Sequence, residues 1–450
     1  MQDDWGEVLK IAEAVRAAGG RALLVGGCVR DSLLGRPCHD FDVEVYGLGP
    51  ERLRSTLSAG WQFDSVGASF GVLKVKHHEI DIALPRTENR LGAGHRDFAV
   101  ATDPELSVAE AAARRDFTVN AILQDPLTGE IIDPWNGRAD LEHKVLRHVS
   151  EHFAEDPLRV LRAMQFAARF RYDVAPETVA LCATMTQEAL PRERLAAEWE
   201  KLLLKGEEPS RGLEFLRACG WLRFYPEIEA LVGVPQSALH HPEGDVWRHT
   251  CLVLDASVRF RTGDADRDLE LALAALCHDF GKPATTVDRG EGKFTSYNHE
   301  TEGAPMARDF TLRLWNQPKR AEAVARLVAS HMRPVQLVLG GAADKAYRRL
   351  AIEAGRLDEL ADLVECDMRG TFAPASSLDI VRRFREKIAA LAIEKAPPEP
   401  LVMGRDLIAR GLRPGPDFGP ILDRCYEAQL SGEFTDREGA IAFLETVLSA

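Results

Sequence analysis

The sequence lacks several features that mark specialised classes of protein. No stretch approaches 18 uninterrupted apolar residues, so it offers no segment for a membrane span. Only eight of the 450 residues are cysteine and none forms a CxxC pair, which argues against a disulfide framework or a cysteine-zinc site. The opening MQDDWGEVLK lacks the basic-then-apolar order of a secretory signal. We therefore predict a cytoplasmic protein with reduced thiols.

Positive charge is also scarce. The chain carries 56 Lys and Arg against 70 Asp and Glu, a formal net charge of −14. Residues 1–150 hold 17 basic and 23 acidic side chains, and segments 151–235, 236–370 and 371–450 are net negative as well. This balance excludes a protein that coats nucleic acid through bulk charge. It is compatible with an enzyme that contacts RNA through a few placed arginines.

The length and the 45% hydrophobic content are sufficient for two to four domains. Apolar spacing predicts a helix over residues 1–20 and strands over 22–25, 42–46 and 72–83, which suits a mixed sheet. From about Glu105 onward helical periodicity dominates. We predict an α+β head at 1–150, followed by helical segments at 151–235, 236–370 and 371–450.

The head combines a glycine turn with spaced carboxylates. A predicted strand runs into Gly26–Gly27, where backbone N–H groups can approach a phosphate, and Arg30 follows on the next helix. Asp40 and Asp42 occupy alternate positions of a strand, so they face the same side and repel each other unless a cation lies between them. Asp81 on a neighbouring strand would add a third carboxylate. Oxygen ligands of this kind suit Mg²⁺, although a DxD pair alone is more often a solvated strand face.

The body contains a spaced set of histidines and aspartates. An adjacent His–Asp pair ends an apolar helix, where two polar groups must be satisfied or must bind something. Alone, such a pair is more often a helix cap, but four nitrogen and oxygen ligands together suit a divalent metal. The predicted ligands are His249, His278, Asp279 and Asp367, with His299 and His331 as additional histidines. We interpret His240 and His241 as loop residues, and His77 and His78 as residues of a strand surface.

The motifs of the head resemble those of class II tRNA nucleotidyltransferases and bacterial poly(A) polymerases, members of the polymerase β-like superfamily. The matching motifs, in order, are GGCVRD at 26–31, GRPCHDFD at 35–42, RRDFTVNA at 114–121, IIDPWNG at 131–137 and EDPLRVLR at 155–162. Their order and spacing extend the resemblance over about residues 20–200. It implies a polymerase β-like nucleotidyltransferase head followed by an all-α neck.

The resemblance also implies roles for individual residues. Asp40 and Asp42 would hold two catalytic Mg²⁺ ions, and Gly27, Arg30 and Arg115 would contact the nucleotide triphosphate. Asp156, Arg159 and Arg162 of the EDPLRVLR motif would select the incoming base without a nucleic-acid template. A carboxylate and a guanidinium on one helical face offer the acceptor and donors of a pairing edge. Outside this context the same motif is an ordinary helix start with ion pairs.

In the body, the pattern H…HD…D resembles the HD phosphohydrolase superfamily, and His299 and His331 resemble the additional histidines of its two-metal members. This implies an HD-type helical domain at 236–370 that binds Ni²⁺, Mn²⁺, Fe²⁺ or Zn²⁺ and has phosphatase or phosphodiesterase activity. The helical tail at 371–450 resembles the closing segment of such nucleotidyltransferases, where Arg405, Arg410 and Arg413 would touch tRNA phosphates or simply flank glycine turns.

The predicted activity is therefore the addition of C and A nucleotides to the 3′ end of tRNA from CTP and ATP, with release of pyrophosphate. The glycine-punctuated loop at 85–98 favours an activity that includes adenosine, because the resembling enzymes need this loop to switch from C to A. The alternatives are an A-adding enzyme or poly(A) polymerase and, in another class, a metal-dependent phosphohydrolase acting on nucleotides or RNA ends. The expected partners are the tRNA 3′ end, ATP and CTP, without a membrane.

Overall fold

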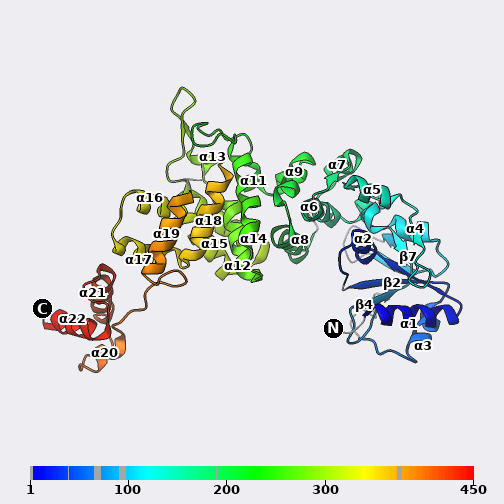
Figure 1. Ribbon diagram of the computed structural model, residues 1–450, viewed down its shortest axis with the longest axis horizontal. Coiled ribbons are helices and arrows are strands. Elements are labelled where there is room, and N and C mark those ends of the chain that lie inside the picture. Colours follow the sequence, from blue (N-terminus) through cyan, green and yellow to red (C-terminus); the bar gives the residue numbers. More distant parts are fainter. Residues whose placement is uncertain are drawn as a thin grey trace. The chain divides into compact units, whose positions relative to one another are not determined.

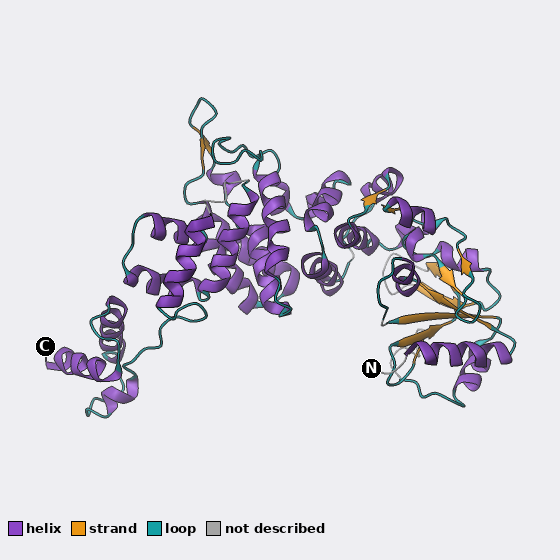
Figure 2. Cartoon of the chain, viewed as in Figure 1, coloured by secondary structure: helices purple, strands orange, loops and turns teal. Residues whose placement is uncertain are grey.

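The computed structural model describes residues 4–38, 40–64, 72–90, 98–188, 190–371 and 378–449, with the backbone alone at 86–90 and 98–102. The chain folds as two compact units, the first formed by residues 1–202 and 206–224 and the second by 203–205 and 225–450. The main sheet lies in the first unit, and the second is almost wholly helical (Figures 1 and 2). The finer division at 150, 235 and 370 stays a prediction.

The first unit begins with a head of mixed secondary structure and continues into helices. The strands of the head are β1 (Arg21–Val25), β2 (Phe41–Tyr46), β3 (Val72–Lys74), β4 (Ile80–Ala83), β5 (Arg86–Arg90), β6 (Phe98–Thr102), β7 (Leu123–Gln124) and β8 (Ile131–Ile132). Its helices are α1 (Asp4–Ala17), α2 (Gly27–Leu33), α3 (Pro50–Leu57), α4 (Val108–Ala113) and α5 (Gly137–His143). The following elements are β9 (Val145–Leu146), α6 (Leu158–Phe170), β10 (Asp173–Val174), α7 (Pro176–Ala183), α8 (Arg192–Lys205) and α9 (Pro209–Ala218).

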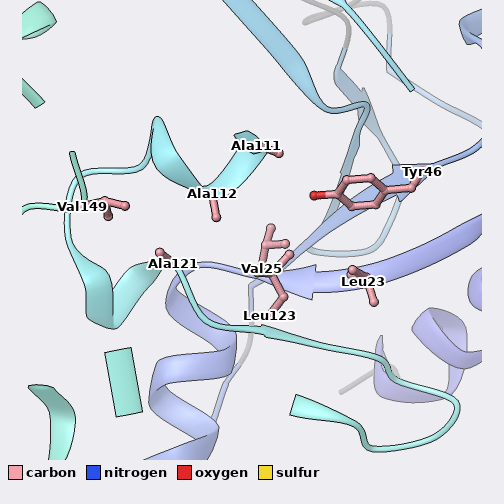
Figure 3. Packing of buried hydrophobic residues seen from close by; sticks show 8 residues of the cluster. All are labelled: Leu23, Val25, Tyr46, Ala111, Ala112, Ala121, Leu123 and Val149. Atoms are coloured by element: carbon pink, nitrogen blue, oxygen red, sulfur yellow. The ribbon is translucent and has the colours of Figure 1, made fainter. Parts of the chain in front are cut away.

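The main sheet has the strand order β3-β4-β2-β1-β7-β8. The β2–β4 pair is parallel, whereas β1–β2, β1–β7, β3–β4 and β7–β8 are antiparallel, so the sheet is mixed as predicted. Leu23 and Val25 of β1 pack with Tyr46 and with Ala111 and Ala112 of α4 in a buried cluster on one face (Figure 3). The other members of the cluster are Ala121, Leu123 and Val149. This core fixes the carboxyl end of β1, where the glycine turn begins.

Helix α1 matches the helix predicted over residues 1–20. Its buried side chains are Val8, Ile11, Ala12 and Val15, the i, i+3, i+4, i+7 spacing of one helical face, and they cover β1 and β2.

Three sequence-based expectations for the head need correction. The strand expected at 72–83 is a hairpin of β3 and β4, because the chain turns at His77, which adopts a positive φ of 67°. His77 and His78 therefore lie in the turn rather than on a strand, and His78 Nδ1 lies 2.7 Å from Asp4 Oδ1.

The sheet also continues beyond Glu105, where only helix was expected, since β7 pairs with β1 and β8 pairs with β7. In the loop expected at 85–98, the backbone of β5 pairs antiparallel with β6, while residues 91–97 lie outside the described part of the chain.

The second unit is built from helices. They are α10 (Pro226–Glu229), α11 (Val246–Ser257), α12 (Ala265–Cys277), α13 (Lys282–Thr285), α14 (His299–Trp315), α15 (Pro318–Ser330), α16 (Arg333–Leu339), α17 (Asp344–Ala354), α18 (Leu357–Gly370), α19 (Leu378–Ala390), α20 (Gly404–Ile408), α21 (Phe418–Ser431) and α22 (Arg437–Ser449). A small hairpin of β11 (Val287–Asp288) and β12 (Phe294–Thr295) interrupts them (Figure 2). Helices α11, α12, α14, α15 and α18 pack on one another, whereas α20–α22 enclose a separate core around Leu407 and Leu444. Within the described residues, no helix is both long and apolar enough to cross a membrane.

Candidate active sites

The glycine turn of the head lies directly against the predicted catalytic carboxylates. Gly26 has a φ of 75°, which a residue with a Cβ adopts only under strain. A Cβ at this position would lie 3.5 Å from Asp42 Oδ2 and 3.4 Å from Arg115 Nη1. The turn therefore joins β1 to α2 while keeping the space next to Asp42 open.

Asp42 forms part of a group of carboxylates on the open face of the sheet. It is opposite Asp81 in the parallel β2–β4 register, Glu44 follows two residues later on the same face, and Asp40 immediately precedes β2. The Asp42 side chain reaches solvent, yet the surrounding protein atoms desolvate it. This desolvation, the charge of Asp40 and weaker repulsion from Asp81 and Glu44 raise the pKa of Asp42 to about 6, against the opposing charge of Arg115.

These carboxylates fit a divalent cation. One oxygen of Asp81, Oδ1, is buried and has no hydrogen-bond partner among the described residues, and Lys74 Nζ lies 4.0 Å away from it. Several carboxylates that repel one another and keep an unpaired oxygen form a donor set suited to a hard cation such as Mg²⁺.

Arg115 and Asp116 connect the carboxylates to helix α6. Arg115 Nη2 lies 3.6 Å from Glu44 Oε2, and Arg115 Nε has no hydrogen-bond partner among the described residues. The Asp116 carboxylate accepts from Arg162 Nε at 2.7 Å and from Asn120 Nδ2 at 2.9 Å. Although burial would raise it, the charge of Arg162 and these hydrogen bonds hold the pKa of Asp116 below its ordinary value. Asp116 thus holds the Arg162 guanidinium in place through its Nε.

Asp156 and Arg159 are held at the start of α6. Arg159 donates from Nη1 to the carbonyl of His152 at 2.7 Å and from Nη2 to the carbonyl of Arg114 at 2.6 Å. Asp156 Oδ1 accepts from the backbone N–H of Leu158 at 3.0 Å, and its Oδ2 accepts from Arg194 Nη2 at 2.9 Å. The base-selecting pair predicted from the sequence is therefore oriented by backbone carbonyls and by a second arginine from α8.

One cavity of about 470 Å³ brings these groups together. Its polar lining consists of Asp42, Glu44, Asp81, Arg114, Arg115, Asp116, Asp156, Arg159, Arg162 and Arg194. Residues from the sheet, from the RRD motif and from α6 thus face a common space, as the motifs predicted. Glu44 and Arg194 were not predicted, but the two-residue period of β2 would have identified Glu44 as a neighbour of Asp42.

Three predicted residues do not line this cavity: Gly27, Arg30 and Asp40. Arg30 is only 4% exposed, donates from Nη1 to Asn120 Oδ1 at 2.6 Å and from Nε to Asp31 Oδ1 at 2.9 Å, and its guanidinium lies 4.5 Å from the ring centre of Phe170. In the structure the Arg30 guanidinium is held by these contacts within the protein, and its contact with a triphosphate stays a prediction.

The predicted histidines of the body converge on a buried centre, each with its ring anchored from outside. The Nδ1 atoms of His278, His299 and His331 lie 2.8, 2.8 and 2.7 Å from the carbonyl oxygens of Ala275, Ser296 and Val328, respectively. A carbonyl can only accept, so Nδ1 carries the proton and Nε2 presents a lone pair. His249 Nδ1 faces Glu243 Oε1 at 2.9 Å, which directs its Nε2 inward in the same way.

These Nε2 atoms meet in two pairs. His249 Nε2 lies 3.2 Å from His278 Nε2 and 3.1 Å from Asp367 Oδ1, and His299 Nε2 lies 3.1 Å from His331 Nε2. Asp279 stands between the pairs, with Oδ2 3.3 Å from His278 Nε2 and Oδ1 3.4 Å from His299 Nε2. Among the described residues, Oδ1 of this buried carboxylate has no hydrogen-bond partner, whereas Oδ2 forms an ion pair with Lys282 Nζ at 2.8 Å. Lone pairs at such distances repel unless a cation lies between them, so the donor set fits two divalent metals that share Asp279.

The carboxylates and His331 are in the charge states that ligate a metal, whereas His249 is not. Although burial opposes its protonation, the hydrogen bonds of His249 to Asp367 and Glu243 raise its pKa to about 9, so a metal would have to displace a proton from this ring. Although burial opposes ionisation, His278 and Lys282 hold the pKa of Asp279 well below its ordinary value, and contact with His249 lowers the pKa of Asp367. Burial and the neighbouring histidines lower the pKa of His331 to about 3. Ionised carboxylates and neutral imidazole are the states that ligate a metal.

Close packing brings the HD loop against α14. A Cβ at Gly281 would lie 2.1 Å from the carbonyl oxygen of His299, so only glycine lets the loop after Asp279 approach the start of α14.

Sequence reasoning missed the residues that support these ligands. Glu243 Oε1 contacts both His249 Nδ1 and, at 2.8 Å, His241 Nδ1. His241 does lie in a loop as expected, but it also lines the cavity next to the predicted metal ligands. We call these ligands the metal-ligand cluster: His249, His278, Asp279, His299, His331 and Asp367. Lys282 Nζ lies 2.8 Å from Asp279 Oδ2 and donates to Gln236 at 2.7 Å. The HDFGK spacing signals the lysine, whereas no local pattern joins Glu243 to His249.

Comparison with known proteins identifies the domains that contain the two sites. Residues 22–147 match the Poly A polymerase head domain, and residues 246–363 match the HD domain. The fold and the two sites thus define a nucleotidyltransferase that carries an HD domain, two classes that imply dependence on divalent metals.

Relatives extend over the whole chain. The "Multifunctional CCA protein" of Verminephrobacter eiseniae is 39% identical over 424 residues, covering 91% of this chain and 98% of its own. The protein of the same name from Leptothrix cholodnii is 39% identical over 437 residues, covering 92% and 96%. The chain belongs to the family of multifunctional CCA proteins, which confirms the predicted family. Among solved structures, the Bacillus stearothermophilus CCA-adding enzyme in complex with CTP matches with a TM-score of 0.65 and 26% identity, over 100% of this chain and 98% of that one.

Proposed function

We propose that the head completes the 3′ CCA end of tRNA by adding C and A from CTP and ATP without a nucleic-acid template. In each addition the RNA 3′-oxygen bonds to the α-phosphorus of the nucleotide, the bond to the oxygen that bridges to the β-phosphorus breaks, and pyrophosphate leaves. The supporting observation is the single cavity in which Asp42 and Asp81 face Arg115, Asp156 and Arg159. The names of the family relatives and the predicted motifs support the same reaction.

Asp40, Asp42 and Asp81 are the residues that would hold Mg²⁺. Bound there, Mg²⁺ would lower the pKa of the attacking 3′-hydroxyl and neutralise charge on the triphosphate. Arg115 Nε, next to these carboxylates, has no hydrogen-bond partner within the described part of the chain, and the same cavity contains Arg162. Guanidinium groups at such a position bind phosphate oxygens through paired N–H donors.

Asp156 and Arg159 explain a preference for C and A. Cytosine and adenine both present an amino donor beside a ring nitrogen that accepts, whereas uracil and guanine present a carbonyl beside an N–H. A carboxylate that accepts from the amino group and a guanidinium that donates to the ring nitrogen fit only the first pattern. The backbone carbonyls that hold Arg159 and the Arg194 contact to Asp156 keep this pair in a fixed orientation.

The test uses tRNA transcripts that end before the CCA, after the first C and after the second C. Each is incubated with Mg²⁺ and CTP, ATP, both, or UTP and GTP. We expect completion to CCA with CTP and ATP together and no extension with UTP or GTP. Extension of only the CC transcript, with ATP alone, would instead identify an A-adding enzyme, and long adenosine tracts would identify a poly(A) polymerase.

The second unit supports a further activity. We propose that His249, His278, Asp279 and Asp367 hold one transition metal, that Asp279, His299 and His331 hold another, and that the site hydrolyses phosphoesters. The observation that favours this is the two pairs of facing Nε2 atoms, at 3.1 Å and 3.2 Å, on either side of the buried Asp279 carboxylate. Hydrolysis adds hydroxide to phosphorus and a proton to the leaving ester oxygen.

Purified protein loaded with Ni²⁺, Mn²⁺, Fe²⁺ or Zn²⁺ tests this activity on adenosine 2′,3′-cyclic phosphate and on adenosine monophosphates. We expect turnover with at least one metal and none after His278→Ala. Turnover that persists in His278→Ala, or that is absent with every metal, would contradict the proposal.

A further inference from the structure

The cavity above the metal-ligand cluster has a polar floor and an apolar mouth. It measures about 400 Å³ and reaches Asp279, His299, His331 and Asp367. Its remaining wall includes the side chains of Phe294, Tyr297, Met332 and Met368. A phosphate group occupies only a small part of this volume, so the apolar mouth is built for the organic part of the substrate.

Tyr297 is an exposed part of this wall. Its side chain is 72% exposed, on the short connection between β12 and α14, two residues before His299. A large aromatic ring left in solvent beside a ligand site offers a stacking surface, because every nucleobase presents a π-face.

The residue before Tyr297, Ser296, is anchored by two contacts. The carbonyl of Ser296 lies 2.8 Å from His299 Nδ1, and the Ser296 hydroxyl is hydrogen bonded to Thr286 Oγ1 at 2.8 Å. The same bond that orients a predicted metal ligand therefore fixes the segment that carries Tyr297. This coupling places the ring at a set position relative to the metal-ligand cluster, as a base would need when its own ribose phosphate lies on that cluster.

We propose that Tyr297 stacks on the base of the substrate, so that the site selects a nucleoside phosphate over a phosphoester without a base. The shared chemistry is a terminal nucleoside with a phosphate on its ribose, either as a free nucleotide or as the 3′ end of an RNA. The inference rests on the proposed phosphohydrolase activity. Hydrolysis of a 2′,3′-cyclic phosphate adds hydroxide to phosphorus, breaks one bond from phosphorus to a ribose oxygen and returns a proton to that oxygen.

The test measures KM and kcat of the full chain, loaded with the metal that supports turnover, on two substrates that differ only in the base. These are adenosine 2′,3′-cyclic phosphate and methyl ribofuranoside 2,3-cyclic phosphate. An RNA oligonucleotide ending in the same cyclic phosphate separates the two sources, since a lower KM than that of the free nucleotide identifies an RNA end. We expect the wild-type chain to prefer the adenosine compound.

We expect Tyr297→Ala to raise KM for the adenosine compound about tenfold and to remove most of the preference over the base-free compound. Tyr297→Phe and Tyr297→Trp keep a stacking ring and should retain the preference. Leu339→Ala is the matched control, because Leu339 is 67% exposed on α16 of the same unit and does not line the cavity.

An unchanged preference in Tyr297→Ala would overturn the inference, as would an equal loss of turnover on both compounds, which indicates damage to the metal-ligand cluster. If the wild-type chain hydrolyses neither compound with any metal, the phosphohydrolase proposal itself fails, and the stacking role fails with it.

Discussion

The two sites of the molecule hold their predicted metal ligands in different ways. In the head, Asp40 and Asp42 are exposed, Asp42 lines an open cavity, and the charge of Arg115 only partly offsets the repulsion between the carboxylates. In the body, His249, His278 and Asp279 are at most 1% exposed, and each histidine ring is fixed by a contact on its outer side. We infer from this difference that the head is suited to a metal that arrives with a nucleotide, and the body to a resident metal.

The largest expected effect is the selective loss of one activity, because the two sites should act independently of each other. We expect Asp42→Ala to lower nucleotide addition about a thousandfold, because several kcal/mol of metal-derived charge stabilisation disappears, and to leave phosphoester hydrolysis intact. His278→Ala should have the reverse effect. Both activities are measured on each purified variant, with Glu51→Ala on the exposed face of α3 as a control for the head. A loss of both activities in either variant would show that the sites are coupled.

The two sites should also differ in how firmly they retain metal. After gel filtration without added metal, we expect the chain loaded with a transition metal to keep it in the body while the head loses Mg²⁺. Nucleotide addition should then require added Mg²⁺, whereas hydrolysis should not require new metal. Elemental analysis gives the metal content per chain, which should fall by at least half in His278→Ala because one of the paired Nε2 ligands is lost. A chain that retains no metal would remove the distinction between the sites.

The two sites also differ in how far the sequence could predict them. The residues predicted as metal ligands of the body were chosen by residue type and spacing, and the structure places them close together, while their binding of metal stays a prediction. In the head, period-two alternation placed Asp40 and Asp42 on one face, with Asp81 of a neighbouring strand as a third carboxylate. The parallel β2–β4 register puts Asp42 beside Asp81, whereas Asp40 precedes β2 and does not line the cavity. Side chains with strong chemical preferences at regular spacings are therefore predictable.

What escaped prediction depends on tertiary contacts. The two-residue strands β7 and β8 carry no periodic signal and form only because β1 offers an edge for pairing. The turn at His77 needs a left-handed backbone that a histidine rarely adopts, so an apparently continuous strand concealed a hairpin. Glu243 contacts His249, and Arg194 contacts Asp156. No local sequence pattern indicates that these segments lie close together.

Within the head, an intermediate effect should come from the residue that orients the base-selecting pair. Arg194→Ala removes the 2.9 Å bond to Asp156, so the carboxylate is free to rotate away from the base. We expect kcat/KM for CTP and ATP to fall about tenfold, with stability changed by less than about 1 kcal/mol, because the pair is partly exposed. Arg192→Ala is the matched control, since Arg192 has similar exposure and pairs with Glu193 outside the cavity. Equal effects of the two substitutions would contradict an orienting role.

The smallest expected effect concerns a buried carboxylate of the body that lies away from the metal-ligand cluster. Glu359 on α18 is 3% exposed, with Oε1 3.0 Å from Arg356 Nε. Burial outweighs the charge of Arg356 and, with repulsion from Asp358 and Glu270, raises the pKa of Glu359 to about 7. The folded state therefore binds a proton that the unfolded state releases between about pH 4.5 and pH 7. Stability from this group is present at low pH and is lost as the pH rises through that window.

Glu359→Gln keeps the shape of the protonated acid and removes its titration. We expect the variant to match the wild type near pH 5 and to be more stable by about 1–2 kcal/mol at pH 8, measured as the shift in calorimetric Tm at each pH. Glu353→Gln on the exposed face of α17 should show no such dependence. If Glu359→Gln were less stable than the wild type at pH 8, the ion pair with Arg356 would outweigh burial. The body would then stabilise its buried acids by pairing, as the first unit does for Asp116 with Arg162.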